Sequence, residues 1–280
     1  MNPQKLKQIM AKVKSFPAMP STATKLLSLL DDPDVSFAQL EEIIRYDPGL
    51  TADILKLTNS AYFGIPLKVS SVKQGMTMLG WKRLLQLVMT LCMSTLMKKP
   101  VPGYDLPQGE LWRHSIAVSI AAENIVKTLK IPDAEDVFTA ALLHDVGKLV
   151  LGSFVKKDLE FIEDMVSKGL TFDVAEHIIL GTDHAEVGSH ILKQWSFPDE
   201  LVNAVRWHHN PESCERYCKM SDIVHVANNI GKEVGAGRKK SDLHSELSVQ
   251  AIDNLGLKPD DLEGIAEQTL EGVDRLAEVL

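Results

Sequence analysis

The sequence is short of positive charge. Its 280 residues contain 30 Lys and Arg against 38 Asp and Glu, which gives a formal net charge of −8 at pH 7. A nucleic-acid-binding protein normally presents a basic face, so this balance argues against DNA or RNA as a partner. A helix-turn-helix reader is also disfavoured, because Lys82 and Arg83 are the only basic residues where the helix after Gly80 would begin.

Long hydrophobic runs and a disulfide framework are also lacking. Charged residues interrupt the apolar stretches well before the roughly 20 residues that a membrane span requires. Neither an apolar run nor a cleavage site follows the Lys-rich N-terminus. The three cysteines, Cys92, Cys214 and Cys218, fit reduced thiols. We therefore expect a cytoplasmic protein with no membrane partner.

Regular alternation of apolar and polar residues, the pattern of a half-buried strand, is missing as well. Apolar residues recur at helical spacing instead, so the sequence predicts an all-α protein. The 45% apolar and 24% charged residues are typical of a globular protein, and the length suits one or two domains.

Two loose joints divide the predicted helices. The stretch 98–103, KKPVPG, is the clearest linker, and 235–241, rich in Gly, Lys and Arg, is the second. We therefore expect four parts: a helical lead over 1–14, a helical subdomain over 15–100, a histidine-bearing subdomain over 104–232 and a helical extension over 241–280.

Several helix starts are marked by capping residues. Ser36 and Ser71 each begin a capping-box pattern, and Asp47 precedes a proline at the first helical position. One long helix is predicted from Trp81 to about Met97, with methionines recurring every four residues along it. Such a stripe is more typical of core filling than of a binding surface.

The stretch 140–149, AALLHDVGKL, joins an apolar helix to a pair of reactive side chains. His144 and Asp145 offer a metal ion an imidazole nitrogen and a carboxylate that can bridge two ions. Gly147 allows a backbone turn that a residue with a Cβ would resist. Lys148 places a positive charge beside any anion that approaches. The pair is therefore predicted to form part of a binding or catalytic site.

Further histidines lie on the apolar faces of other predicted helices. A buried imidazole is costly unless it is hydrogen-bonded or binds a metal ion. One such residue is ordinarily a core histidine, whereas several on converging helices can hold one or two ions. Mixed nitrogen and oxygen ligands suit Fe, Mn, Ni or Zn without selecting among them. The candidates besides His144 are His114, His184, His208 and His209.

This order of residues resembles the HD superfamily of metal-dependent phosphohydrolases. Its signature is a first histidine, a His-Asp pair followed by a lysine, and a terminal aspartate; the dinuclear branch adds a histidine and a His pair. The resemblance implies that the matching residues hold a mono- or dinuclear metal site, and that Asp145 and Lys148 are catalytic if the protein is an enzyme. In family order they are His114, His144, Asp145, Lys148, His184, His208 and His209.

Two features depart from these relatives. The position of the terminal aspartate falls on Asn228, whose uncharged amide oxygen is a weaker ligand than a carboxylate. The related HD-GYP phosphodiesterases carry a Gly-Tyr-Pro motif after the His pair, whereas here 210–213 read NPES. We therefore regard Asn228 as a weak candidate ligand and do not expect cyclic di-GMP hydrolysis by that route.

Motifs in both halves resemble the HDOD family, the HD-related output domain. The resemblance covers residues 15–230 and implies a bacterial, all-helical signalling module in which a helical subdomain packs on an HD-like bundle. The family has no established catalytic activity, and the implied partner is a signalling protein or a small phosphorylated ligand. The motifs are FPAMP at 16–20, DPGL at 47–50, NSAYFG at 59–64, MLG at 78–80, LWRHS at 111–115 and WSFP at 195–198.

Two functions follow from these resemblances. The first is a non-enzymatic regulatory module whose metal is structural or sensing. The second is a metal-dependent phosphohydrolase acting on a nucleotide or cyclic nucleotide, in which Asp145 bridges two ions and Lys148 stabilises phosphate charge. Asn228 and the missing Gly-Tyr-Pro motif favour the first. A di-iron oxygenase, which some dinuclear HD relatives resemble, is a third.

Overall fold

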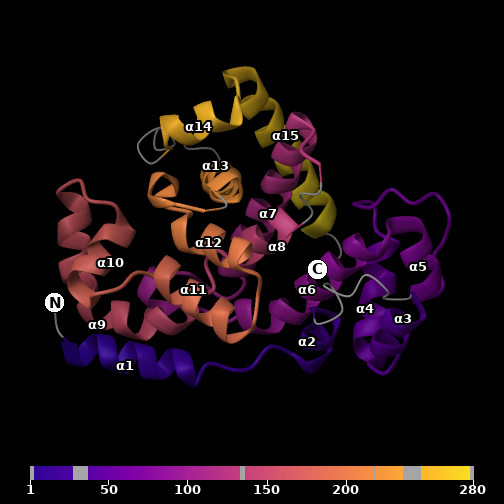
Figure 1. The fold of residues 1–280 in the computed structure, drawn as a ribbon, viewed down its shortest axis with the longest axis horizontal. Helices are drawn as coiled ribbons and strands as arrows, with labels where there is room; N and C mark the ends of the chain where they lie inside the picture. Colours follow the sequence, from indigo (N-terminus) through magenta and orange to yellow (C-terminus); the bar gives the residue numbers. More distant parts are fainter. Residues whose placement is uncertain (1–2, 28–36, 133–135, 217, 236–246, 278–280) are drawn as a thin grey trace. The chain divides into compact units, whose positions relative to one another are not determined.

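The computed structural model describes residues 3–27, 37–132, 136–216, 218–235 and 247–277. Within these ranges the chain folds into helices without a β-strand, and one isolated bridge pairs Val101 with Leu106. The expected all-α class is therefore confirmed (Figure 1). The capping box predicted at Ser36 lies outside the described residues.

The chain forms two compact units. The larger contains residues 1–17 and 97–269, and the smaller contains 18–96 and 270–280. The N-terminal helix α1 (Pro3–Lys14) thus belongs to the larger unit, which also holds all the histidines predicted to bind metal. The subdomain boundaries expected near the two loose joints stay predictions.

In the smaller unit, two of the predicted capping residues lie at helix starts. Asp47 Oδ1 accepts a hydrogen bond from Leu50 N at 3.0 Å, and Ser71 Oγ accepts one from Gln74 N at 3.2 Å. The predicted methionine stripe is fully buried and fills the core. The helices are α2 (Ser21–Leu27), α3 (Phe37–Arg45), α4 (Pro48–Thr58), α5 (Val72–Leu79) and most of α6 (Trp81–Met97).

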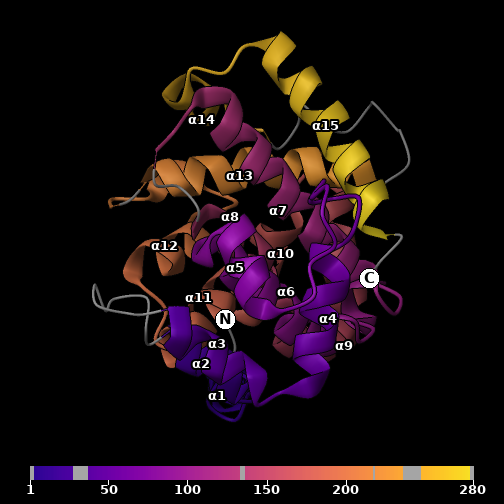
Figure 2. The same cartoon turned by 90° about the vertical axis from the view of Figure 1, so that its right-hand side faces the viewer.

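The larger unit is a bundle in which α7 and α13 lie side by side (Figures 1 and 2). Two 3₁₀ turns, η1 (Pro102–Tyr104) and η2 (Pro211–Ser213), interrupt its connections. After α1, its helices are α7 (Glu110–Leu129), α8 (Asp136–Leu143), α9 (Lys148–Ser167), α10 (Phe172–Leu180), α11 (His184–Gln194), α12 (Asp199–Trp207), α13 (Cys218–Gly235), α14 (Val249–Leu255) and the first part of α15 (Pro259–Ala277).

The starts of α9 and α11 lie against each other at Gly147. The turn 144–147 separates α8 from α9, and α11 begins against it. A Cβ on Gly147 would overlap the carbonyl oxygen of His184 and would lie 2.7 Å from the backbone nitrogen of Gly188. Glycine alone permits so close an approach of two backbones. This contact brings the His-Asp pair beside His184.

One stretch, 136–167, is long and apolar enough to cross a membrane by length and composition. It comprises α8, the turn 144–147 and α9, and 78% of its most apolar window is buried inside the fold. Core helices of globular proteins have the same character, so the stretch is weak evidence for a membrane span.

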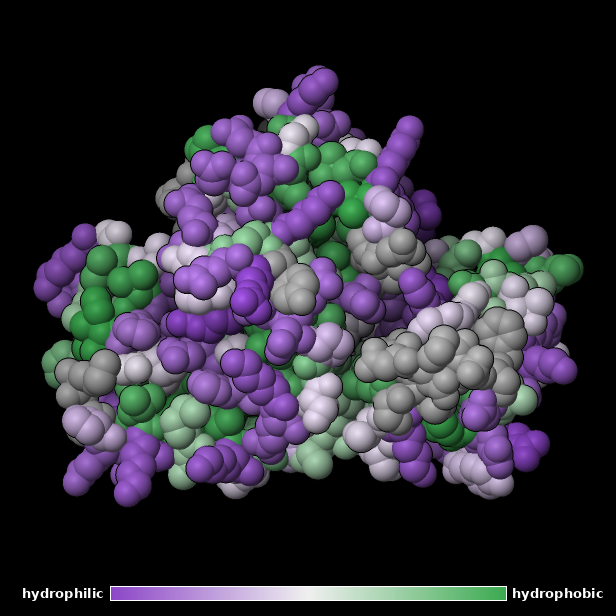
Figure 3. Space-filling model, viewed as in Figure 1, coloured by the Kyte–Doolittle hydropathy of each residue, from purple (hydrophilic) through white to green (hydrophobic). Residues whose placement is uncertain are grey.

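The helix α10 has two contrasting faces. Val174 and Ile178 are exposed, and Figure 3 shows the hydrophobic surface that lies over this helix. The opposite face carries Ala175 and Glu176, both fully buried. A fully buried carboxylate is rare unless it is paired, and its partner lies in the histidine cluster.

Candidate metal centre

The structure brings the predicted site residues together in the core of the larger unit. Most of them lie at helix ends, where the backbone turns and a side chain can point along the bundle axis. Asp183, for example, caps α11 by accepting from Glu186 N at 2.7 Å, which makes His184 the first residue of that helix. The assembled residues are His114 in α7, His144 and Asp145 after α8, His184 in α11, His208 and His209 after α12, and Asn228 in α13.

Asp145 lies at the middle of this cluster, and its two carboxylate oxygens face different histidines. Oδ2 lies 3.3 Å from His144 Nε2 and 3.6 Å from His114 Nε2. Oδ1 lies 3.3 Å from His184 Nε2 and 3.9 Å from His208 Nε2. The side chain is 1% exposed. A carboxylate placed in this way can bridge two ions.

The donor atoms fall into two groups around Asp145. The donor atoms of His184, His208 and His209 lie within 4.8 Å of one another, as the ligands of one ion must, and so do those of His114, His144 and Asp145. We call His184, His208 and His209 the three-histidine side. We call His114, His144 and Asn228 the amide side, because Asn228 Oδ1 lies 3.1 Å from His114 Nε2.

Hydrogen bonds orient three of the imidazoles. His144 Nδ1 and His208 Nδ1 donate to the carbonyl oxygens three residues before them, at 2.7 Å and 2.8 Å. His184 Nδ1 donates to Glu176 Oε2 at 2.7 Å. Because Nδ1 carries the proton in each ring, the lone pair of Nε2 faces Asp145. Such outer partners are the usual way to fix the tautomer and orientation of a metal-binding histidine.

Three buried atoms of the cluster lack a hydrogen-bond partner among the described residues. They are His144 Nε2, His208 Nε2 and Asp145 Oδ1. A buried polar atom without a partner is costly, and a divalent ion between these atoms would satisfy all three. The mixture of imidazole nitrogen and carboxylate oxygen suits divalent transition metals. The residues present therefore fit one or two such ions.

The protonation states suit the same ions. Burial and the neighbouring His144 lower the pKa of His114 to about 3. Burial and nearby histidines also hold the pKa values of His208 and His209 well below the ordinary range. These imidazoles are consequently neutral at physiological pH, which is the form that binds metal.

The pKa values of two other groups are shifted toward the charged form despite burial. Burial alone would raise the pKa of Asp145, but His144 and the Lys148 ammonium outweigh it and hold that pKa well below its usual range. Burial alone would lower the pKa of His184, but the Glu176 carboxylate outweighs it and raises that pKa. The Glu176 carboxylate thus places a negative charge behind the His184 ring, and Asp145 places another at the centre of the cluster.

Lys148 pairs with only one oxygen of Asp145. Its Nζ donates to Oδ2 at 2.6 Å and lies 5.5 Å from the centre of the Tyr104 ring. The same ring meets His184 edge-on, with centroids 6.1 Å apart. Tyr104 and Lys148 therefore cover the centre from one side.

One histidine and two cysteines outside the cluster have structural partners. His225 Nδ1 donates to the carbonyl oxygen of His208 at 2.7 Å, and its Nε2 accepts from Ser248 N at 2.9 Å. Cys218 Sγ donates to the carbonyl oxygen of Cys214 at 2.6 Å, and both are free thiols, which fits the expected reduced state. His225 thus supports the backbone of His208 from behind.

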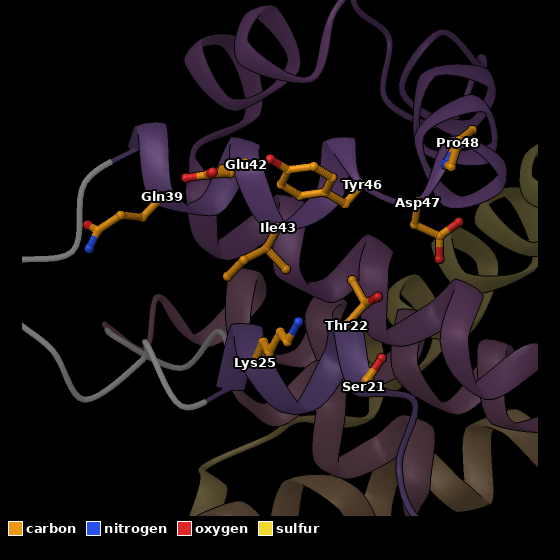
Figure 4. A pocket seen from close by; sticks show the side chains of 9 residues that line it. All are labelled: Ser21, Thr22, Lys25, Gln39, Glu42, Ile43, Tyr46, Asp47 and Pro48. Atoms are coloured by element: carbon orange, nitrogen blue, oxygen red, sulfur yellow. The ribbon is translucent and has the colours of Figure 1, made fainter.

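A separate pocket of about 640 Å³ lies within the smaller unit. Figure 4 shows Glu42 of α3 and Tyr46, which follows that helix, on one side and Lys25 of α2 on the other. None of the residues predicted to bind metal lines it.

Comparison with protein families gives one match. The HDOD domain matches residues 16–211, which include His114, the His-Asp pair and the His pair. The match ends before Asn228 and therefore does not cover that position.

Solved structures of similar fold come from several bacteria. A protein of Shewanella amazonensis SB2B, provisionally named a phosphohydrolase, is 26% identical, has a TM-score of 0.73 and covers 96% of this chain and 97% of its own. An HDOD domain protein of unknown function from Geobacter sulfurreducens is 25% identical, with a TM-score of 0.73, over 98% of this chain and 92% of its own.

An uncharacterised protein of Treponema pallidum (strain Nichols) is 25% identical over 220 residues. The aligned part is 78% of this chain and 42% of that protein. This chain therefore spans less than half the length of that curated relative.

Proposed function

Because the chain belongs to the HDOD family, we propose that it is a signalling module whose HD-like centre holds one or two divalent metal ions as a structural or sensing element. The observation that carries the proposal is the set of three unpartnered buried atoms, His144 Nε2, His208 Nε2 and Asp145 Oδ1, which face one another in the core. An ion bound there would supply a buried positive charge and Lewis acidity.

The low exposure of the centre supports regulation over turnover. The side chains of His144 and His208 are fully buried and that of Asp145 is 1% exposed. Small parts of His114 and Lys148, 20% and 18%, are open to solvent, and His209 is half-buried. A phosphate ester would have to displace Tyr104 or the lysine to contact Asp145, whereas a bare ion needs a much smaller opening.

The chain's own residues perform the sensing role in this proposal. Neutral imidazoles supply nitrogen donors, and the ionised Asp145 joins the two sides of the centre. An ion on the three-histidine side would link α11 to the ends of α8 and α12, and an ion on the amide side would link the end of α8 to α7 and α13. Metal binding is therefore expected to stabilise the larger unit in proportion to ion concentration. The proposed partner is a signalling protein or a small phosphorylated ligand.

A metal-dependent phosphohydrolase is the second candidate. The observation in its favour is the ion pair between Lys148 and Asp145, which places a cation beside the carboxylate where a phosphate oxygen would approach. The Shewanella protein that carries the provisional name phosphohydrolase shares 26% of its residues with this chain. The substrate would be a nucleotide or cyclic nucleotide.

Elemental analysis and an activity screen separate these candidates. We expect purified protein to contain one or two transition metal ions per chain, and the Asp145→Ala variant to lose them. We expect no hydrolysis of nucleotides or cyclic nucleotides by the metal-loaded protein. Metal-dependent turnover that disappears in Asp145→Ala would establish the phosphohydrolase instead, and metal-free protein that takes up no ion would refute both.

A further inference from the structure

The two sides of the centre are not equivalent, and three independent observations rank them in the same order. We infer that the three-histidine side binds its ion first and more tightly, and that Glu176 is the positioning residue responsible. The amide side then binds a second, weaker ion. This inference rests on the proposed metal-binding function and adds an order of filling to it.

The first observation is the environment of Glu176. This carboxylate is fully buried, and Oε2 accepts from both His184 N at 2.9 Å and His184 Nδ1 at 2.7 Å. A carboxylate behind a metal-binding histidine fixes its ring and raises its basicity. It also adds a negative charge near one ion position only, since the Nδ1 protons of His144 and His208 go to neutral backbone carbonyls.

The second observation is the unequal pairing of the Asp145 oxygens. Oδ1, which faces the three-histidine side, has no hydrogen-bond partner. Oδ2, which faces the amide side, accepts from Lys148 Nζ at 2.6 Å. An ion on the three-histidine side can use its oxygen directly, whereas an ion on the amide side must share its oxygen with an ammonium group that repels it.

The third observation concerns the donors of the amide side. Asn228 carries no charge, and its Oδ1 lies 3.1 Å from His114 Nε2, the nitrogen that would bind the ion. If that contact is a hydrogen bond from the ring, Nε2 holds the proton. An ion must break this contact, just as an ion on the three-histidine side must separate His184 Nε2 from His209 Nε2, which lie 2.8 Å apart. The two sides differ in their donors, because the amide side includes a neutral amide oxygen, whereas the three-histidine side offers three imidazoles.

Cobalt(II) titration of the EDTA-treated full chain tests the order of filling. Equilibrium dialysis gives the stoichiometry, and visible absorption reports the ligands of each bound ion. We expect two steps in the wild-type protein, the second at least about tenfold weaker. Glu176→Gln keeps the shape of the side chain and removes its charge. It should weaken the first step by about 10- to 100-fold, shift the corresponding absorption band and leave the second step unchanged.

Two further variants keep the test decisive. Asn228→Asp should tighten the second step alone, and it remains informative if Glu176→Gln fails to fold. Glu163→Gln is the control, because Glu163 of α9 is exposed and belongs to none of the groups of residues that could hold an ion. It should change neither step.

The possible outcomes are distinct. Two equal steps in the wild type, an effect of Glu176→Gln on the second step, or an effect of Asn228→Asp on the first would each overturn the order of filling while leaving the metal-binding function intact. One equivalent that Glu176→Gln weakens, with a second appearing only in Asn228→Asp, supports the order. No cobalt binding in any variant refutes the proposed function and this inference with it.

Discussion

The amide side and the three-histidine side face the same carboxylate but are supported by different parts of the fold. His114 and Asn228 lie within α7 and α13, so helix packing sets their positions. His184, His208 and His209 lie at the ends of α11 and α12, where hydrogen bonds to Glu176 and to the backbone orient the rings of His184 and His208. The comparison teaches that similar donors acquire different affinities from the groups behind them.

The largest expected effect comes from a matched pair of substitutions, His208→Ala and His144→Ala. Both residues are fully buried and both donate through Nδ1 to a carbonyl three residues earlier. His208→Ala should weaken the first binding step by about 100-fold or more, since losing a ligand exceeds losing an outer partner. His144→Ala should affect the second step alone. Cobalt titration of both variants measures this, and equal losses in both would show that the sides are equivalent.

Gly147→Ala should disturb both sides together. Its Cβ would overlap the carbonyl oxygen of His184, so the backbones of α9 and α11 must separate. We expect a loss of about 1–3 kcal/mol in the free energy of unfolding, the usual penalty for overpacking. Gly264→Ala is the control, because its added Cβ meets no atom within 4 Å and α15 favours alanine over glycine. Urea unfolding compares the two, and a neutral Gly147→Ala would contradict the close contact.

In metal-free protein, acidification should change the contributions of His114 and His184 to folding stability in opposite directions. Burial lowers the pKa of His114 to about 3. Below pH 6.5 the unfolded chain therefore binds a proton at this residue that the folded chain does not bind. Below pH 6.5 this residue therefore costs about 1.4 kcal/mol of stability per pH unit. The pKa of His184 is raised, because Glu176 outweighs burial, so its stabilising contribution is complete at low pH and is lost as pH rises through the folded value.

Urea unfolding at pH 7.5 and 5.5 checks this contrast with two variants. The destabilisation caused by His114→Gln should shrink on acidification, and that caused by His184→Gln should grow. The same trend in both variants would show that Glu176 does not distinguish the two sides.

The smallest expected effect is that of Lys148→Met, which removes the cation but keeps an apolar stem beside Tyr104. Without the ammonium group 2.6 Å from Oδ2 of Asp145, the second ion should bind about tenfold more tightly. The first step should change less, since Oδ1 is not paired with the lysine. A larger gain in the first step than in the second, seen by cobalt titration, would contradict this pairing.

Much of the centre was predictable because its residues occupy positions with clear local signals. His144 and Asp145 end an apolar helix, and His184 and His208 follow capping or helix-ending patterns. The sequence therefore identified the residues that the structure assembles around Asp145, although their role as ligands stays a prediction. Asn228 was singled out as the departure from the family, and it lies against His114.

Glu176 was missed, and the reason is physical. Its partner, His184, is eight residues away and on another helix, so no local spacing connects them. The available signal was a charged residue inside the apolar stripe formed by Phe172, Ala175 and Ile179 of α10. The unequal pairing of the Asp145 oxygens was also beyond the sequence, because it depends on which oxygen Lys148 approaches in three dimensions.

The packing of the N-terminal helix was likewise not predictable from its amphipathic pattern. Lys5 Nζ donates to Asp158 Oδ2 at 2.8 Å and Lys12 Nζ to Ser153 Oγ at 2.8 Å, which attaches α1 to α9. An amphipathic pattern shows that a helix will pack but does not name the surface it packs on.

The hydrogen bonds of His225 provide a natural reporter for the centre. One ring nitrogen donates to the carbonyl oxygen of His208 at 2.7 Å, and the other accepts from Ser248 N at 2.9 Å. An ion bound to His208 would withdraw electron density from that residue and so change the strength of both hydrogen bonds of His225. The amide proton of Ser248, which lies just before α14, would then change its NMR chemical shift when the ion arrives. Metal occupancy in the core would thus be visible at a backbone position 40 residues further along the chain.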